Sequence, residues 1–166
     1  TKAEEVKREL ELIAQHQVAL VTCVDDNYPS QLLNIYDPPP FLYVKGELRQ
    51  EDSLAVAVVG SRFASHYGKS AAESISRGLA REGLTIVSGM ARGIDTCAHR
   101  SALSAGGRTI AVLGCGIGVN YPVENRKLKE AISTQGALLS EFPMSTPPAA
   151  SHFPMRNRII SGMSLG

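Results

Sequence analysis

At the start of the chain, apolar residues recur every three or four positions, as on one face of a helix. Further along, they gather in short continuous runs. Val6, Leu10 and Ile13 recur between charged residues, a pattern that predicts an amphipathic helix over residues 3–17. Residues 18–22 are then expected to form a short strand or an extended connector, and residues 31–35 one or two helical turns. A strand is expected over residues 41–44, ending at Gly46. The prolines at 38–40 favour an extended backbone, because a proline ring excludes the helix interior.

From residue 54 onward, short continuous apolar runs alternate with helical patterns, at a repeat of about 30 residues. The strands predicted in this part occupy residues 56–59, 84–87, 109–113 and 137–140. The helices predicted between and after them occupy residues 65–82, 92–105, 124–134 and 156–163. Within the first of these helices, Tyr67, Ala71, Ile75 and Leu79 share one face, and Gly83 is a candidate C-cap.

Continuous apolar strands indicate a sheet that is covered on both faces, and the repeat length fits right-handed βαβ crossovers. We therefore predict an α/β protein with a Rossmann-like, mostly parallel, doubly wound sheet and helices on both faces. Residues 1–50 are predicted to form a small N-terminal helix with a Pro-rich extended segment, and residues 51–166 the Rossmann-like domain. A doubly wound fold would return from the last helix to a further strand, so the C-terminal part of the sheet is expected to be missing.

Composition narrows the class of protein further. The chain of 166 residues is 43% hydrophobic and 20% charged, as in ordinary soluble domains. No apolar run approaches the ~20 residues that span a bilayer, so no membrane association and a cytoplasmic location are expected. The three cysteines form no CxxC pair, which argues against zinc and disulfides. With a net charge of +1, any anion site must arise from local placement of basic residues.

Glycine-rich turns follow the strands of the Rossmann-like part. Because the carboxyl ends of parallel strands meet at one edge of a sheet, these turns are expected to share one crevice. Helix N-termini there would offer unpaired amides and a positive dipole end, which suit phosphate. The candidate residues in the first three turns are Gly60, Ser61, Arg62, Ser88, Gly89, Ala91, Arg92, Gly93, Asp95, Gly114 and Gly116.

Individual residues in these turns suggest individual contacts. Arg62 can bind a phosphate through its forked guanidinium, with Ser61 as a hydrogen-bond donor. Asp95 either caps the following helix or belongs to the binding surface, and its sequence context leaves both interpretations open. Tyr121 could stack on a base, with Asn125 forming a hydrogen bond to it. Alternatively, Tyr121-Pro122 could simply close a turn.

The segment before the last predicted helix combines an aromatic ring with cations. Phe153 precedes Arg156, Asn157 and Arg158, an arrangement suited to base stacking and anion binding. A solvated helix start is the plainer interpretation of the same residues.

Common nucleotide motifs are absent. Gly68-Lys69-Ser70 lacks the earlier glycine of a P-loop, because Phe63 occupies that position. The glycines at 114, 116 and 118 do not form a GxGxxG motif, because Val119 occupies the position of its third glycine. Asp95 and His99 lie one helical turn apart without a third metal ligand, so neither a cofactor nor a metal is expected.

Taken together, the motifs closely resemble the DNA-processing protein A family, also called Smf. The segments that carry the resemblance are Tyr28-Pro29, 37–40, Gly60-Ser61-Arg62, 88–95, Tyr121-Pro122 with Asn125, Ser140-Glu141 and 153–162. The resemblance implies a bacterial cytoplasmic protein that binds single-stranded DNA in natural transformation, protects incoming strands and helps to load the RecA recombinase. It implies no catalysis, and self-association as a homodimer in the full-length protein.

The same motif matching places Gly60, Ser61, Arg62, the 88–95 loop, the turn before Asn125 and residues 153–158 on the DNA-binding surface. The family continues beyond residue 166.

The alternative is an enzyme, since nucleotide phosphoribohydrolases use a related scaffold. Those enzymes carry a Pro-Gly-Gly-x-Gly-Thr run before a catalytic glutamate. This chain has no such run, although the C-terminal segment expected to be missing is where it would fall.

Overall fold

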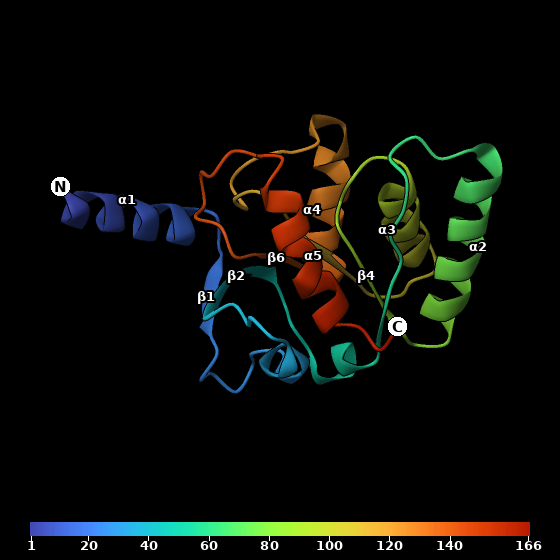
Figure 1. Ribbon diagram of the computed structural model, residues 1–166, viewed down its shortest axis with the longest axis horizontal. Helices are drawn as coiled ribbons and strands as arrows, with labels where there is room; N and C mark the ends of the chain where they lie inside the picture. Colours follow the sequence, from blue (N-terminus) through green and yellow to red (C-terminus); the bar gives the residue numbers. More distant parts are fainter.

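One six-stranded sheet, in the order β1-β2-β6-β5-β4-β3, organises the molecule (Figure 1). The computed structural model describes residues 1–166. The strands are β1 (Ala19–Thr22), β2 (Phe41–Gly46), β3 (Ala55–Ala57), β4 (Thr85–Ser88), β5 (Thr109–Val112) and β6 (Ala137–Ser140). Strands β3 to β6 are mutually parallel, whereas β2 pairs antiparallel with β6 and β1 antiparallel with β2.

Five α-helices and three short 3₁₀ segments accompany the sheet. The helices are α1 (Lys2–Gln15), α2 (His66–Arg81), α3 (Ile94–Ser104), α4 (Arg126–Gln135) and α5 (His152–Gly162). The 3₁₀ segments are η1 (Ser30–Asn34), η2 (Gln50–Ser53) and η3 (Val123–Asn125). Every predicted element is present, although α5 begins at His152 rather than at residue 156. None of these helices combines the length and the apolar character that crossing a membrane requires.

The helices cover both faces of the sheet, which confirms the predicted doubly wound class. On one face, Val87 and Val112 pack with Ile159 and Ile160 of α5. On the opposite face, Leu138 packs with Leu128 and Ile132 of α4, and Ile86 packs with Ala98 and Ala102 of α3. Figure 1 shows α5 in front of the strands with α4 behind them.

Strands from the first 50 residues belong to the same sheet as the Rossmann-like part. Strand β2 pairs with β6 from Tyr43 opposite Ser140 to Gly46 opposite Ala137, and β1 extends the sheet beyond β2. The division into 1–50 and 51–166 therefore falls within a continuous sheet, and as a division into folding units it stays a prediction. At the other edge, the Leu165 amide donates to the Ala55 carbonyl oxygen over 2.8 Å, so the final residues lie along β3.

Helix α2 packs through a different face from its apolar stripe. The structure buries Ala72, Ser76 and Ala80, while Tyr67 and Ile75 are 84% and 56% exposed. Small side chains allow α2 to lie close against α3, and that close packing outweighs the larger apolar residues on the other side of the helix.

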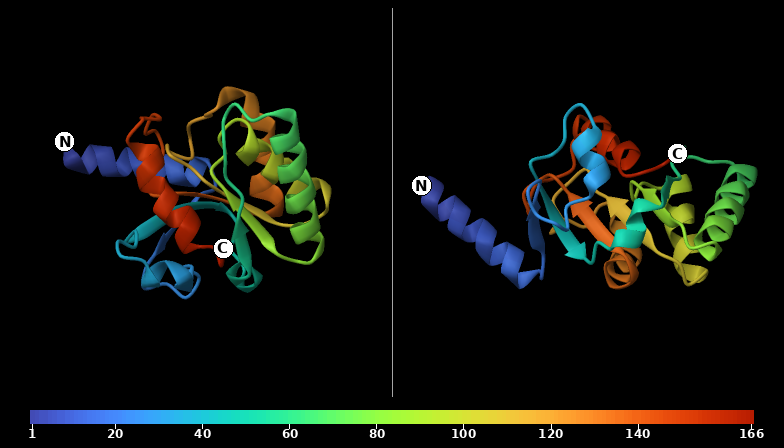
Figure 2. Two further views of the ribbon diagram at one scale, coloured as in Figure 1. Left: turned by 45° about the vertical axis from the view of Figure 1, so that its right-hand side comes forward. Right: turned by 90° about the horizontal axis from the view of Figure 1, so that it is seen from below.

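Helix α1 projects away from the sheet (Figures 1 and 2). Its Val6 and Leu10 are 59% and 57% exposed, whereas Leu12 and Ile13, near its end, pack against the core. The Glu9 carboxylate accepts a hydrogen bond from the Met144 amide over 2.7 Å, which ties the helix to the loop after β6.

Candidate nucleic-acid interface

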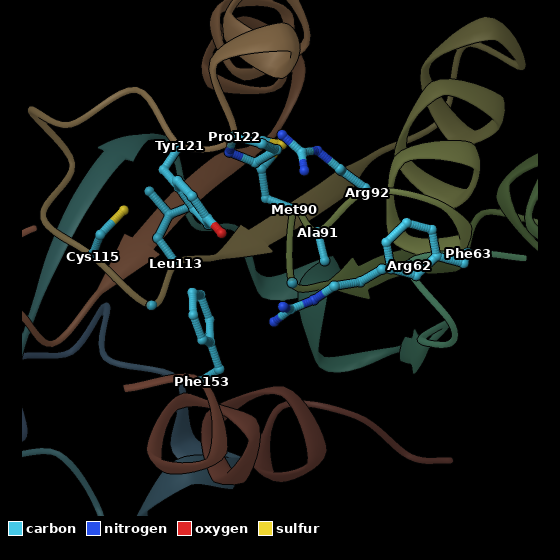
Figure 3. A pocket seen from close by; sticks show the side chains of 12 residues that line it. Arg62, Phe63, Met90, Ala91, Arg92, Leu113, Cys115, Tyr121, Pro122 and Phe153 are labelled. Atoms are coloured by element: carbon cyan, nitrogen blue, oxygen red, sulfur yellow. The ribbon is translucent and has the colours of Figure 1, made fainter. Parts of the chain in front are cut away.

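The turns after β4 and β5 meet the turn after β3 and the start of α5 in a cleft at the carboxyl edge of the sheet (Figure 3). Met90, Leu113 and Cys115 are buried and form its apolar base. Its rim carries Arg62, Arg92, Tyr121 and Phe153, with Gly89, Ala91 and Gly114 between them. The predicted convergence of the glycine turns is therefore observed, and the cleft combines an apolar base with cationic and aromatic walls.

Arg62, Phe153 and Tyr121 form a continuous cationic and aromatic wall. The Arg62 guanidinium lies 5.0 Å from the centre of the Phe153 ring, and the Tyr121 ring centre is 5.9 Å from that of Phe153. Arg62 forms no ion pair, while Arg92 at the opposite rim is paired with Glu124. Figure 3 shows the Tyr121 and Phe153 rings and the Arg62 side chain directed into the same space. Arg62 thus keeps its hydrogen-bond donors for a ligand.

Asp95 holds the first two turns together from beneath. Its buried carboxylate accepts hydrogen bonds from the amides of Gly60, Gly89 and Ala91, over 3.4, 3.1 and 3.2 Å. Burial raises the pKa of Asp95, and these amides together with nearby Arg156 oppose that rise. These amides are therefore taken up by the protein itself, which leaves the exposed side chains of the turns for a ligand.

Arg156 is buried behind the cleft rather than in it. Its Nη1 atom donates to the carbonyl oxygens of Gly89, over 2.8 Å, and of Val112. The side chain therefore fastens α5 to the ends of β4 and β5. Burial lowers the pKa of Arg156, and the Asp95 carboxylate partly offsets that effect.

Arg158 is also engaged within the protein. Its Nη1 and Nη2 atoms donate to the two carboxylate oxygens of Glu141 over 2.6 and 2.7 Å, and its Nε donates to the Asp37 carbonyl oxygen over 3.0 Å. These bonds join α5 to the loop after β6 and to the Pro-rich segment. Of the segment from Phe153 to Arg158, only Phe153 lines the cleft, while Asn157 is an exposed residue of α5.

Several other predicted site residues support the loops from inside. Ser88 is buried and donates to the Val58 carbonyl oxygen over 2.6 Å. Asn125 is buried, and its Nδ2 donates to the Met90 carbonyl oxygen over 3.1 Å and to Thr96 Oγ1 over 2.8 Å. The Gly116 amide donates to the Thr146 carbonyl oxygen over 2.9 Å. These contacts set the shape of the cleft without facing it.

The turn after β3 sits against the start of α3. Gly93 has φ +76°, and a Cβ atom there would lie 2.2 Å from the Ser61 carbonyl oxygen, so only glycine fits. Ser61 is exposed, and its Oγ accepts a hydrogen bond from the Phe63 amide over 3.1 Å.

Three residues that line the cleft were not predicted from the sequence: Phe63, Leu113 and Cys115. Each flanks a glycine turn or follows the end of a strand, and this position is the only feature of the sequence that could have indicated a place in the cleft. Met90 adopts a left-handed conformation with φ +60° while its side chain is 2% exposed.

The fold and the cleft define a Rossmann-like α/β protein with a candidate anion-binding and stacking site at the carboxyl ends of its parallel strands. The family model described as DNA recombination-mediator protein A matches residues 19–166, and the chain belongs to this family.

Curated relatives agree with this assignment. The chain is 48% identical over 143 residues to DNA processing protein DprA of Streptococcus pneumoniae, covering 86% of the chain and 50% of that protein. It is 47% identical over 148 residues to protein Smf of Escherichia coli, covering 89% of the chain and 40% of that protein. The chain thus spans half or less of the length of these relatives.

Solved structures of the same family share the fold. The X-ray structure of DprA from S. pneumoniae has a TM-score of 0.84 at 44% identity, covering 92% of this chain and 54% of that one. A structure of DNA processing protein A from Helicobacter pylori has a TM-score of 0.80 at 33% identity, covering 89% and 66%. That structure is described as showing a single-stranded DNA binding mode.

Proposed function

We propose that this chain binds single-stranded DNA in the cleft, with a base against the aromatic wall and a phosphate at Arg62. Membership of the recombination-mediator family and the H. pylori relative described with single-stranded DNA support the proposal.

The observation that carries the proposal is the unpaired Arg62 guanidinium beside the Tyr121 and Phe153 rings. An aromatic ring beside a cation suits an unpaired nucleotide, because the base stacks on the ring while its phosphate meets the cation. In a duplex the base faces are covered by neighbouring pairs, so this wall favours a single strand. Stacking of this kind contributes about 1–3 kcal/mol per base.

Binding rather than catalysis is the role we assign to the cleft. No carboxylate is among the residues that line it, and the buried Asp95 is held by backbone amides. A phosphoribohydrolase would need a free carboxylate facing its substrate, so this lining supports a binding role over the enzyme alternative.

The cellular role proposed follows from the family. We place the full-length protein in the bacterial cytoplasm, where it would protect DNA strands taken up in transformation and help to load RecA onto them as a homodimer. Relatives named as DNA processing proteins in S. pneumoniae and Bacillus subtilis support this placement.

Competition for a labelled oligo-dT, followed by fluorescence anisotropy, tests the binding mode. Unlabelled single strand should displace the label, and a hairpin duplex of equal charge should do so poorly. Tyr121→Ala should weaken binding by about 10-fold or more, given the usual worth of one stacked base. Tyr36→Ala is the matched control, because Tyr36 is fully exposed outside the cleft.

Equal displacement by duplex and single strand would contradict the proposed mode, as would Tyr121→Ala binding with the affinity of Tyr36→Ala. Release of free base from nucleoside monophosphates by the purified protein would favour the enzyme alternative.

A further inference from the structure

A second hollow, rich in basic side chains, lies on the other side of the loop that carries Tyr121. It is bordered by His16 after α1, by Lys45 of β2, by Arg126 and Lys129 of α4, and by Ile117 and Asn120 of the loop. We name it the basic hollow. It shares no residue with the cleft, although the loop over residues 113–121 borders both.

Lys129 is the buried cation of the basic hollow. Its side chain is 7% exposed, and its Nζ donates to the carbonyl oxygens of Ile117 and Val119 over 2.6 and 2.7 Å. No carboxylate pairs with it. Burial lowers the pKa of Lys129 to about 8, an effect that the Cys115 thiol opposes and Lys45 reinforces. A buried charge without a counter-charge is costly, so an anion in this hollow would be stabilised.

Two neighbouring side chains of the basic hollow also have no partner within the protein. Lys45 and His16 are half-buried, and neither side chain forms an ion pair or a hydrogen bond within the protein. Lys45 faces α4, because Tyr43, two residues earlier on β2, packs in the core on that side of the sheet. Arg126 pairs with Glu130 over 3.2 Å, and Glu130 is the one carboxylate among the lining residues.

The hollow and the cleft are connected through the loop between them. Gly114 and Tyr121 line the cleft, whereas Ile117 and Asn120, between them in sequence, line the basic hollow. Lys129 holds this loop by the carbonyl oxygens of Ile117 and Val119, two residues before Tyr121.

We propose that the basic hollow binds a phosphate group of the same DNA strand whose base occupies the cleft. The strand would pass over the loop at Asn120, with a phosphate held by Lys45, His16 and Lys129 further along. This assignment rests on the proposed function, and it extends the site beyond the residues that the motifs mark. Lys129 is a positioning residue as well, because it anchors the loop that presents Tyr121.

The test compares a double variant, Lys45→Met with His16→Gln, with Lys127→Met. Lys127 is the matched control because it is exposed on α4 and does not line the basic hollow. Affinity for a long oligo-dT should fall about 5-fold or more in the double variant and stay near the wild-type value in the control. The slope of log affinity against log salt should flatten by about 0.7 for each phosphate that the variant no longer neutralises. Affinity for a dinucleotide, which fills the cleft alone, should not change.

The outcomes separate this proposal from the proposed function. If the wild-type protein binds oligo-dT and the double variant matches Lys127→Met in affinity and slope, the basic hollow is not on the strand's path and the proposed function stands. If the wild-type protein binds neither the long oligonucleotide nor the dinucleotide, both the proposed function and the role of the basic hollow are contradicted.

A titration with inorganic phosphate at constant ionic strength tests whether the hollow binds a phosphate of the strand or free phosphate. The NMR signals of the His16 ring report the binding. A phosphate response at His16, together with unchanged DNA binding by the double variant, would assign the hollow to free phosphate and overturn its place on the strand.

Discussion

The four arginines at predicted site positions fall into two groups according to what their guanidinium groups touch. Arg156 and Arg158 are bound to backbone carbonyls and carboxylates inside the protein. Arg62 and Arg92 lie at the rim of the cleft, and of these only Arg62 has no ion pair. Motif spacing marks all four equally, because a one-dimensional pattern does not record which donors are already engaged.

His99 shows how a buried group near the site affects stability. Its ring is fully buried, Nδ1 lies 2.6 Å from Thr109 Oγ1, and Nε2 has no partner. Thr109 Oγ1 donates to the Ile86 carbonyl oxygen, so the proton between Thr109 and His99 belongs to Nδ1. Burial, reinforced by Arg156, lowers the pKa of His99 to about 3.

This lowered pKa predicts a loss of stability in mild acid. An unfolded histidine titrates near pH ~6.5, so below that pH the unfolded chain binds a proton that the native state refuses. Between about pH 7 and about pH 5, His99 should therefore reduce the free energy of unfolding by about 2 kcal/mol.

Urea denaturation at the two pH values, compared between variants, checks the prediction. His99→Gln should remove about 2 kcal/mol of the pH dependence, while His66→Gln, at an exposed position in α2, should retain it. Equal pH dependence in His99→Gln and wild type would contradict the assignment.

At the scale of elements, the cleft depends on close contact between the turn after β5 and α5. A Cβ atom on Gly114 would lie 2.7 Å from the Phe153 ring. Gly114→Ala should displace Phe153, lower the free energy of unfolding by about 1–3 kcal/mol and weaken oligo-dT binding. Gly78→Ala in α2 is the control, since nothing lies within 4 Å of its Cβ. This control should gain about 0.5–1 kcal/mol, because alanine favours a helix interior.

Urea denaturation and anisotropy measure both effects on the same preparations. Wild-type stability and affinity in Gly114→Ala would show that Phe153 is not fixed by this contact.

Element positions could be predicted from the sequence because they depend on local periodicity and turn chemistry. The packing of α2 could not, since Tyr67 and Ile75 form the apolar stripe while the contact with α3 uses Ala72, Ser76 and Ala80. Which face of a helix is buried depends on the shape of its neighbour, and that information lies elsewhere in the chain.

At the scale of the whole molecule, the parallel order of β3 to β6 brings distant glycine turns to one edge, as the pattern predicted. The antiparallel addition of β2 to β6 joins residues nearly a hundred positions apart, and nothing local in either strand specifies that partner. The cleft could be located from its motifs, but its apolar base and the buried roles of Asp95, Arg156 and Asn125 depend on the assembled sheet.

Near-neutral net charge makes local placement of cations decisive for DNA binding. With a net charge of +1, the molecule offers little general attraction for a polyanion, so affinity should depend on a few individual side chains. Arg62 is the foremost of these, because it lies in the cleft and has no ion pair. Arg81, the last residue of α2, lies before β4 and hence at the opposite edge of the sheet.

The most direct measurement is the affinity for labelled oligo-dT across a range of salt concentrations, for wild type, Arg62→Ala and Arg81→Ala. We predict saturable binding that weakens with salt, a clear loss of affinity in Arg62→Ala, and a salt slope flatter by about 0.7 in that variant. Arg81→Ala should match wild type in both quantities. Identical affinity and slope in Arg62→Ala and Arg81→Ala would contradict the assignment of the cleft as the DNA site.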